Sequence, residues 1–239
     1  MALLVPVQSS SAGARSPTGT PSTGSKVDGE AAAAQGCLAV MLGAAVNQDG
    51  RSSSLTAPNG PAQQQVIRQA LKAAGVEPGA IAALQMHGTG TPLGDPIEVG
   101  AALEALLRPQ GAEPPFDTPP FPQQGTILSS SLRLLGSKST VGHAEPAAGL
   151  TALIYAVHQA CGRMALPLEH LRTLNPHVAG ALQSQQQQQS DTACRRVGAP
   201  RQFEPMMAAK PSGYRSAADV GICIGVSAFA FQVNIYSIF

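Results

Sequence analysis

Short apolar runs of strand length recur along the chain, each bounded by glycine, proline or polar residues. Such runs are typical of buried strands, and they lie at residues 37–46, 81–86, 126–131 and 220–226. In the last run, bulky Val and Ile alternate with Gly and Cys, so we expect one face of that strand to admit a closely packed neighbour.

Between these runs lie three segments whose apolar residues follow the period of a helix. The first, 61–74, has Pro61 in its first turn and Gly75 just past its end, which suit the start and the stop of a helix. The others are 96–107 and 146–160, and the last is apolar almost all round. That pattern predicts a helix buried at the centre of a layered domain. Strands and helices in alternation predict an α/β fold.

Three stretches have too little apolar periodicity to offset the entropy of ordering them: 1–36, 108–124 and 179–218. The last contains five consecutive glutamines at 185–189. We therefore expect a disordered, low-complexity N-terminus, followed by one domain over 37–239 that carries two low-complexity insertions.

Charge and hydropathy exclude two classes of partner. The 239 residues carry a formal net charge of +1, whereas nucleic-acid surfaces and electrostatic membrane binders need clustered lysine and arginine. No apolar run reaches the roughly 18 residues of a membrane span. We expect neither a nucleic-acid nor a membrane partner.

The four cysteines lie far apart and form no CxxC pair: Cys37, Cys161, Cys194 and Cys223. This spacing predicts neither a zinc site nor a redox dithiol, and it favours a reducing compartment. The N-terminus lacks the basic region of a secretory signal. We expect a cytoplasmic protein, with a plastid or other organelle as the alternative because residues 1–27 are rich in Ser and Thr and contain no acidic residue.

Two histidines each follow a predicted strand and enter a glycine-containing loop that leads into a predicted helix. His87 precedes the 96–107 helix, and His143 precedes the 146–160 helix, with Lys138 five positions before it. Functional groups gather at such strand ends, and the partial positive charge of a helix N-terminus disfavours imidazolium. His143 is therefore expected to be neutral. A pair of neutral donors can stabilise a developing enolate or oxyanion.

Other interpretations of these residues remain open. Either histidine could be structural or solvated, while a metal site is disfavoured because the two lie far apart without a third ligand at suitable spacing. We interpret the remaining histidines as structural: His158, His170 and His177. Motifs of other enzymes are incomplete in this sequence. Residues 225–229 lack the second glycine of a nucleophile elbow, and residues 136–139 lack the residue order of a P-loop. Residues 88–90 are not followed by the third glycine of a dinucleotide-binding loop.

Two long motifs closely resemble the β-ketoacyl synthase (ketosynthase) domain of modular polyketide synthases: HGTGTPLGDPIE at 87–98 and KSTVGHAEPAAG at 138–149. Three shorter segments fit the same family: NQDGRS at 47–52, LTAPNGP at 55–61 and NPH at 175–177. The resemblance extends over 38–107, 126–178 and 220–234.

The resemblance implies a thiolase-like fold, with helices between mixed sheets, and the decarboxylative Claisen condensation of a malonyl unit with an acyl thioester. It assigns His87 and His143 to the hydrogen bonds that stabilise the enolate left by carbon dioxide loss. It also makes Lys138 the residue that orients and polarises the histidine loop, and Glu98 the carboxylate partner of that lysine.

The resemblance further implies that Thr89 and Thr91 contact a pantetheine arm, and that Phe231 is the gating residue whose N–H helps form the oxyanion hole. No cofactor is expected on the chain itself, since the malonyl and acyl thioesters ride on the phosphopantetheine of an acyl carrier protein. A homodimer, or a chain that supplies the N-terminal half, is the other expected partner.

The chain departs from the family pattern where the nucleophile is expected. Nothing before His87 resembles the family's Asp-Thr-Ala-Cys-Ser-Ser motif, and the similar letters at 191–194 follow both histidines and stand beside the glutamine run, so we interpret them as coincidence. The lysine loop is one residue shorter than usual, and 227–234 lacks the family's glycines.

We therefore expect the C-terminal half of an acyltransferase of the 3-oxoacyl synthase type, carrying the decarboxylation residues without the nucleophilic cysteine. Two alternatives stay open: a non-catalytic pairing or scaffold subunit of a condensing enzyme, and a degenerate inactive fragment.

Overall fold

The computed structural model describes residues 38–50, 58–107, 131–187, 196–206, 222–230 and 233–238. The chain divides into two compact units, 1–40 and 41–239, and the second contains every helix and strand of these ranges. The disorder predicted for 1–36 and for 108–124 lies outside the described residues, as does Phe231.

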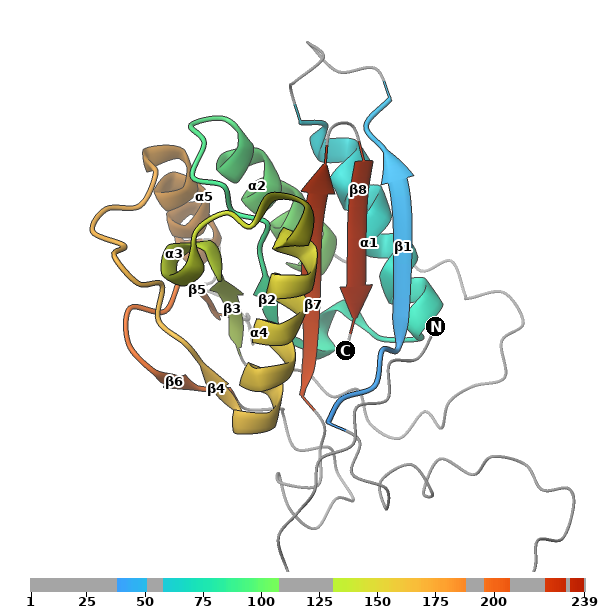
Figure 1. The fold of residues 1–239 in the computed structure, drawn as a ribbon. Helices are drawn as coiled ribbons and strands as arrows, with labels where there is room; N and C mark the ends of the chain where they lie inside the picture. Colours follow the sequence, from blue (N-terminus) through green and yellow to red (C-terminus); the bar gives the residue numbers. More distant parts are fainter. Residues whose placement is uncertain are drawn as a thin grey trace, which may run out of the picture. The chain divides into compact units, whose positions relative to one another are not determined.

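A mixed six-stranded sheet is the framework of this unit (Figure 1), with strand order β1-β8-β7-β2-β3-β5. Strands β7, β2, β3 and β5 run parallel, and β8 runs antiparallel to both β7 and β1. Their bounds are β1 (Gly43–Gln48), β2 (Ile81–Gln85), β3 (Ser131–Leu135), β5 (Arg196–Gly198), β7 (Cys223–Ala230) and β8 (Val233–Ile238). A separate antiparallel pair joins β4 (Met164–Ala165) to β6 (Glu204–Pro205).

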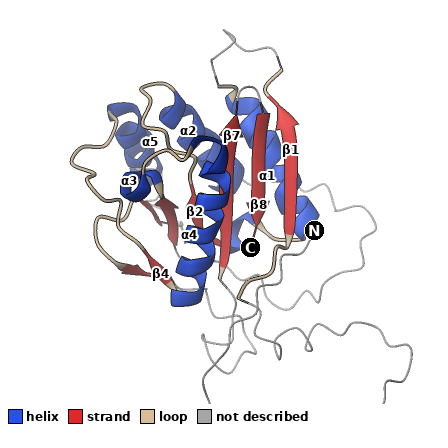
Figure 2. Cartoon of the chain, in the orientation of Figure 1, coloured by secondary structure: helices blue, strands red, loops and turns tan. Residues whose placement is uncertain are grey.

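The helices cover the two faces of the sheet unequally. Helices α1 (Gly60–Ala74) and α5 (Pro176–Gln187) both pack on α2 (Gly94–Leu107) behind the sheet as drawn in Figure 2. Helix α4 (Ala148–Gly162) lies in front, against β7 and β2 (Figure 2). One-turn helices complete the unit: Pro78–Ala80, α3 (Lys138–Val141) and Glu145–Ala147. The alternation of strands and helices confirms the predicted α/β class. No helix in the described ranges is long and apolar enough to cross a bilayer.

Helix α1 confirms the sequence signals that delimit it. The Asn59 side chain accepts a hydrogen bond from the Ala62 N–H at 3.2 Å, and Pro61 stands in the first turn, where no intrahelical donor is needed. Gly75 ends the helix in the left-handed conformation at φ 63°, and its N–H bonds back to the last turn.

Strand pairing shifts several predicted boundaries. The strand expected at 37–46 begins only at Gly43, which pairs with Ile238, and continues to Gln48 because its whole length pairs with β8. The strand expected at 126–131 is described from Ser131 onward, where it pairs with β5, and 126–130 lies outside the described residues. Strand β7 runs on to Ala230, beyond the predicted end, because β8 returns beside it.

Part of the range 179–218, which the sequence predicts to be a low-complexity insertion, forms helix and strand in the described residues. Residues 179–187 are the later turns of α5, where Val178 and Leu182, one turn apart, are buried in the core with α2. Strands β5 and β6 lie within 196–206. The rest of that range lies outside the described residues.

Two apolar clusters form the core, one on each face of the sheet. The larger joins α1, α2 and α5 to residues such as Leu84 and Tyr236, and the smaller joins α4 to Ile224 and Val226. The close neighbour expected beside β7 is Tyr236 of β8, whose ring leaves no room for a Cβ at Gly225.

The prediction that the 146–160 helix is buried at the centre of the domain is wrong for the described chain. Helix α4 buries its small residues, among them Ala152 and Ala156, against the sheet. Its large apolar residues point away, with Leu150 57% and Ile154 60% exposed. Among the described elements, the sheet therefore covers one side of α4, and none covers the side that carries Leu150 and Ile154.

Candidate functional site

The two loop histidines meet at one edge of the sheet. His87 follows β2, and His143 follows α3 in the connection that leaves the neighbouring strand β3. Because parallel strands end at the same edge, both loops emerge there. The imidazole centroids lie 5.6 Å apart with their planes at 86°, in an edge-to-face contact.

The backbone around His87 is held from both sides. Glu98, buried in α2, accepts the His87 N–H on Oε1 at 2.7 Å and the Gly88 N–H on Oε2 at 2.9 Å. Lys138 donates from Nζ to the His87 carbonyl. A carboxylate and an ammonium thus bind the two polar groups of one loop residue.

Both imidazoles accept a backbone hydrogen bond on Nδ1. The donor to His87 is the Phe229 N–H at 3.3 Å, and the donor to His143 is the Glu145 N–H at 2.9 Å. A neutral imidazole that accepts on one nitrogen carries its proton on the other. Each ring therefore presents an Nε2–H donor, and two such donors can bind one oxygen that gains negative charge.

Burial sets the protonation of the site. It lowers the pKa of His87 to about 4, with further lowering by the charge of Lys138 and by His143, so this ring is neutral at pH 7. Burial also lowers the pKa of Lys138, against the opposing charges of Glu98 and Asp95. It raises the pKa of Glu98, while hydrogen bonds from Ser227, Gly88 and His87 act in the opposite direction.

The predicted pairing of Lys138 with Glu98 takes an indirect form. Among the described residues no ion pair joins them, and each instead binds the backbone of His87, one at the carbonyl and the other at the N–H. The reason is that His87 and Gly88 offer Glu98 two backbone donors that would otherwise be buried without partners.

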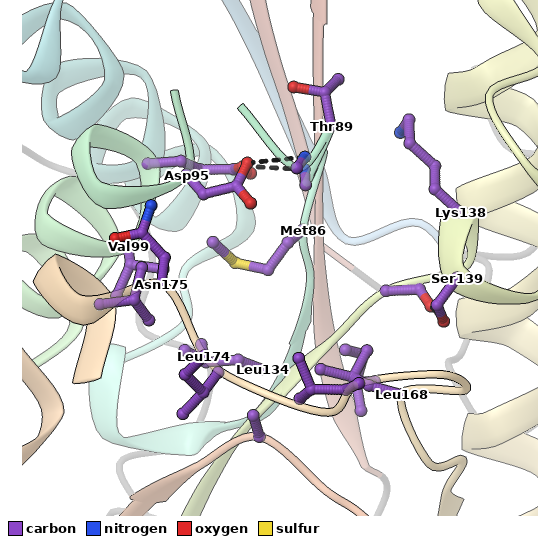
Figure 3. A pocket seen from close by; sticks show the side chains of 18 of the residues that line it. Met86, Thr89, Asp95, Val99, Leu134, Lys138, Ser139, Leu168, Leu174 and Asn175 are labelled. Carbon is purple, nitrogen blue, oxygen red and sulfur yellow. Dashed lines mark hydrogen bonds between the residues drawn. The ribbon is translucent and has the colours of Figure 1, made fainter. Parts of the chain in front are cut away.

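A cavity of about 470 Å³ lies beside this loop, bounded by α2, α5, the end of β3 and the segment 168–175. Its wall is apolar at Met86, Val99 and several leucines, and Asp95 and Lys138 lie on opposite sides of it (Figure 3). Thr89 lines this cavity.

The predicted binding residue Thr91 is not among the residues that line the cavity. Its side-chain oxygen accepts the Gly94 N–H at 3.0 Å, so it caps the start of α2.

Two residues of the site escape sequence reasoning. Ser227 comes from β7, 140 positions after His87, and only the fold brings its hydroxyl within 3.1 Å of the His87 N–H. Asp95 accepts the Gly90 N–H at 3.1 Å and stiffens the loop. The signal that could have identified Asp95 is its position at the start of a helix, five residues after a glycine. No local sequence pattern marks Ser227.

Neither cysteine of the described ranges lies near the histidines. Cys161 is in the last turn of α4, roughly 20 Å along the helix from its histidine end, and Cys223 begins β7, six residues before Phe229. Within the same ranges, no cluster of three or more His, Cys, Asp or Glu side chains is arranged to hold a metal ion. The described site thus offers hydrogen-bond donors and no thiol nucleophile.

Comparison with known proteins gives one consistent answer. Residues 38–117 match the family described as Beta-ketoacyl synthase, C-terminal domain. The chain is 45% identical over 143 residues to Erythronolide synthase EryA2 of Saccharopolyspora erythraea, covering 59% of this chain and 4% of that protein. It is 47% identical over 143 residues to the spectinabilin polyketide synthase system protein NorB of Streptomyces orinoci, covering 59% and 6%. The chain therefore spans less than a tenth of these relatives.

Solved structures agree with the sequence match. The oxazolomycin ketosynthase domain OzmH KS7 of Streptomyces albus superposes with a TM-score of 0.64 at 29% identity, over 88% of this chain and 31% of that chain. Ketosynthase twelve from the bacillaene polyketide synthase of Bacillus amyloliquefaciens shares the fold, with a TM-score of 0.62 at 22% identity, over 85% and 30%. The sequence match and the shared fold together show that this chain carries a C-terminal β-ketoacyl synthase domain of thiolase-like fold.

Proposed function

We propose that this chain supplies the decarboxylation half of a condensing enzyme in polyketide or fatty-acid synthesis. The observation that carries the proposal is the pair of Nε2–H donors of His87 and His143, whose Nδ1 atoms are both occupied by backbone N–H groups. Such preorganised donors stabilise oxygen charge in a transition state without having to reorient.

The proposed reaction uses both donors. A malonyl thioester places its carbonyl oxygen between the two Nε2–H groups. The bond from the α-carbon to the carboxylate carbon breaks, carbon dioxide leaves, and the electron pair becomes an enolate whose oxygen charge the histidines bind. The enolate carbon then attacks the acyl thioester carbonyl, forming a carbon–carbon bond and releasing a thiol.

The substrates in this proposal are malonyl and acyl groups on the phosphopantetheine of an acyl carrier protein, with no cofactor held by the chain itself. Thr89, exposed beside His87, is suited to bind the pantetheine amides. Thr91 and Phe231 keep their proposed roles at the arm and at the oxyanion hole. The thiol that holds the acyl group comes from a second polypeptide segment that covers α4, and we place the protein in the cytoplasm.

The test is decarboxylation of a malonyl carrier protein by the full chain, followed as acetyl carrier protein by mass spectrometry. His143→Ala removes one of two donors and is expected to lower the rate about 100-fold. His158→Ala, on the exposed face near the other end of α4, is the control and should leave the rate unchanged. A rate that survives His143→Ala contradicts the proposed role, and condensation by the chain alone contradicts the need for a second segment.

A second candidate function is a non-catalytic pairing subunit, and the exposed Leu150 and Ile154 of α4 favour it. Such a subunit would bind its condensing partner through this face and show no decarboxylation. An inactive wild-type chain that still binds its partner supports this candidate over the first.

A further inference from the structure

A buried serine lies behind the His87 backbone. Ser227, on β7, is 2% exposed, and its Oγ donates to Glu98 Oε1 at 2.5 Å. The same oxygen accepts the His87 N–H at 3.1 Å. A hydroxyl has one proton and two lone pairs, so giving the proton to Glu98 leaves a lone pair for the histidine.

The Glu98 carboxylate depends on this hydroxyl. Its Oε1 accepts from both Ser227 and the His87 N–H, while Oε2 accepts from Gly88. A buried carboxylate is costly unless donors surround it. Of the three donors that the described residues offer to Glu98, two are backbone N–H groups and the third is the Ser227 hydroxyl. Without the hydroxyl, Oε1 would lose one of its two donors.

The strand that carries Ser227 also fixes the imidazole. Two residues farther along β7, the Phe229 N–H donates to His87 Nδ1, and the Phe229 ring lies 5.2 Å from the imidazole centroid. Displacing the His87 backbone from β7 would therefore lengthen the bond that selects the Nε2–H tautomer.

We propose that Ser227 is a positioning residue for His87: together with Glu98 it clamps the His87 N–H to β7 and so keeps the ring in the Nε2–H tautomer. The inference rests on the proposed function of His87 as a hydrogen-bond donor. The charged or titratable groups around the ring are Glu98 from α2, Lys138 from α3 and His143 from the following loop.

The direct experiment is a long-range ¹H–¹⁵N spectrum of the histidine rings in the full-length chain, with His87 assigned by its loss in His87→Gln. In the wild type, Nδ1 of His87 should resonate as an unprotonated imine nitrogen at pH 7. In Ser227→Ala we expect this signal to move toward the protonated position, because the two tautomers mix once the clamp is lost.

Two variants keep the test decisive if Ser227→Ala fails to fold. Ser227→Thr retains the hydroxyl and should restore the wild-type spectrum, and Ser227→Cys, a weak acceptor, should move the signal part of the way. Ser237→Ala, on the neighbouring strand β8, is the matched control and should leave the His87 signal unchanged. An unaltered His87 signal in folded Ser227→Ala, or in folded Ser227→Cys, overturns the proposal.

The activity readout separates this proposal from the proposed function. Ser227→Ala is expected to lower kcat for decarboxylation about tenfold with KM unchanged. The reason is that a misplaced donor stabilises the transition state less well, while it affects binding of the substrate in its ground state little. If the His87 signal shifts in Ser227→Ala but the wild-type chain shows no decarboxylation, the proposed function is contradicted and the role of Ser227 is supported. If the wild-type chain decarboxylates but the signal does not shift in Ser227→Ala, the role of Ser227 is contradicted and the proposed function is supported.

Discussion

The helices on the two faces of the sheet differ in which apolar side chains they bury. Behind the sheet, α1, α2 and α5 bury large side chains such as Val66, Leu103 and Leu182. In front, α4 buries alanines and exposes Leu150 and Ile154. Val46 of the edge strand β1 is also 61% exposed. A face that turns its largest apolar groups outward is a site for another protein layer.

Coverage in the comparisons points the same way. The chain superposes with 88% of its length on a ketosynthase of which it covers only 31%. In the described chain three helices cover one face of the sheet, whereas the outward side of α4 is exposed, and this is the side on which the second segment of the proposed function would pack.

The largest expected difference between the faces is in stability. Leu84→Ala, at a fully buried position, should lower the free energy of unfolding by about 3 kcal/mol, because it leaves a cavity in the larger cluster. Ile154→Ala should change it by less than about 0.5 kcal/mol. Urea denaturation of both variants measures the difference. Equal losses would show that α4 is buried in solution.

Charged substitutions on the exposed face of α4 should affect stability little and association strongly. Leu150→Glu combined with Ile154→Glu should leave the melting temperature of the chain nearly unchanged and abolish self-association or partner binding, measured by sedimentation velocity. Leu93→Glu, an exposed position in the His87 loop, is the control. A wild-type chain that is monomeric and melts cooperatively would contradict the need for a covering layer.

A further prediction concerns the pH dependence of stability. His87 has its pKa lowered from 6.5 to about 4, so between these values the unfolded chain takes up a proton that the folded chain does not. The free energy of unfolding should therefore fall as pH drops from about 6.5 to about 4, and His87→Gln should remove this contribution. Urea denaturation across that pH range tests it, and identical slopes in both proteins would refute the assigned burial of the ring.

The sequence predicts the framework where the signals are local. Pro61 and Gly75 delimit α1 correctly, and the two histidine loops emerge at one edge because each follows a strand of the same parallel pair. The glutamines of α5 obscure its helical pattern, although Val178 and Leu182 stand one turn apart, and the strand Val233–Ile238 is not predicted at all.

Long-range contacts set the limit of what the sequence predicts about the site. The clamp of Ser227 on His87, and the capture of the His87 carbonyl by Lys138, join residues brought together only by strand order. The resemblance names Glu98 as the carboxylate partner of Lys138, whereas its contacts with the backbone N–H groups of His87 and Gly88 depend on how α2 lies against the loop.

Strand β8 follows every other described element in the chain, yet it lies between β1 and β7 in the sheet. During synthesis, β8 is made after the other described strands, so the ladder of β1 can form only once a neighbour about 190 residues farther along the chain is present. Until then the edges of β1 and β7 are open to wrong partners. A ribosome-bound chain that stops before residue 233 should accordingly leave both edges unpaired and bind chaperones.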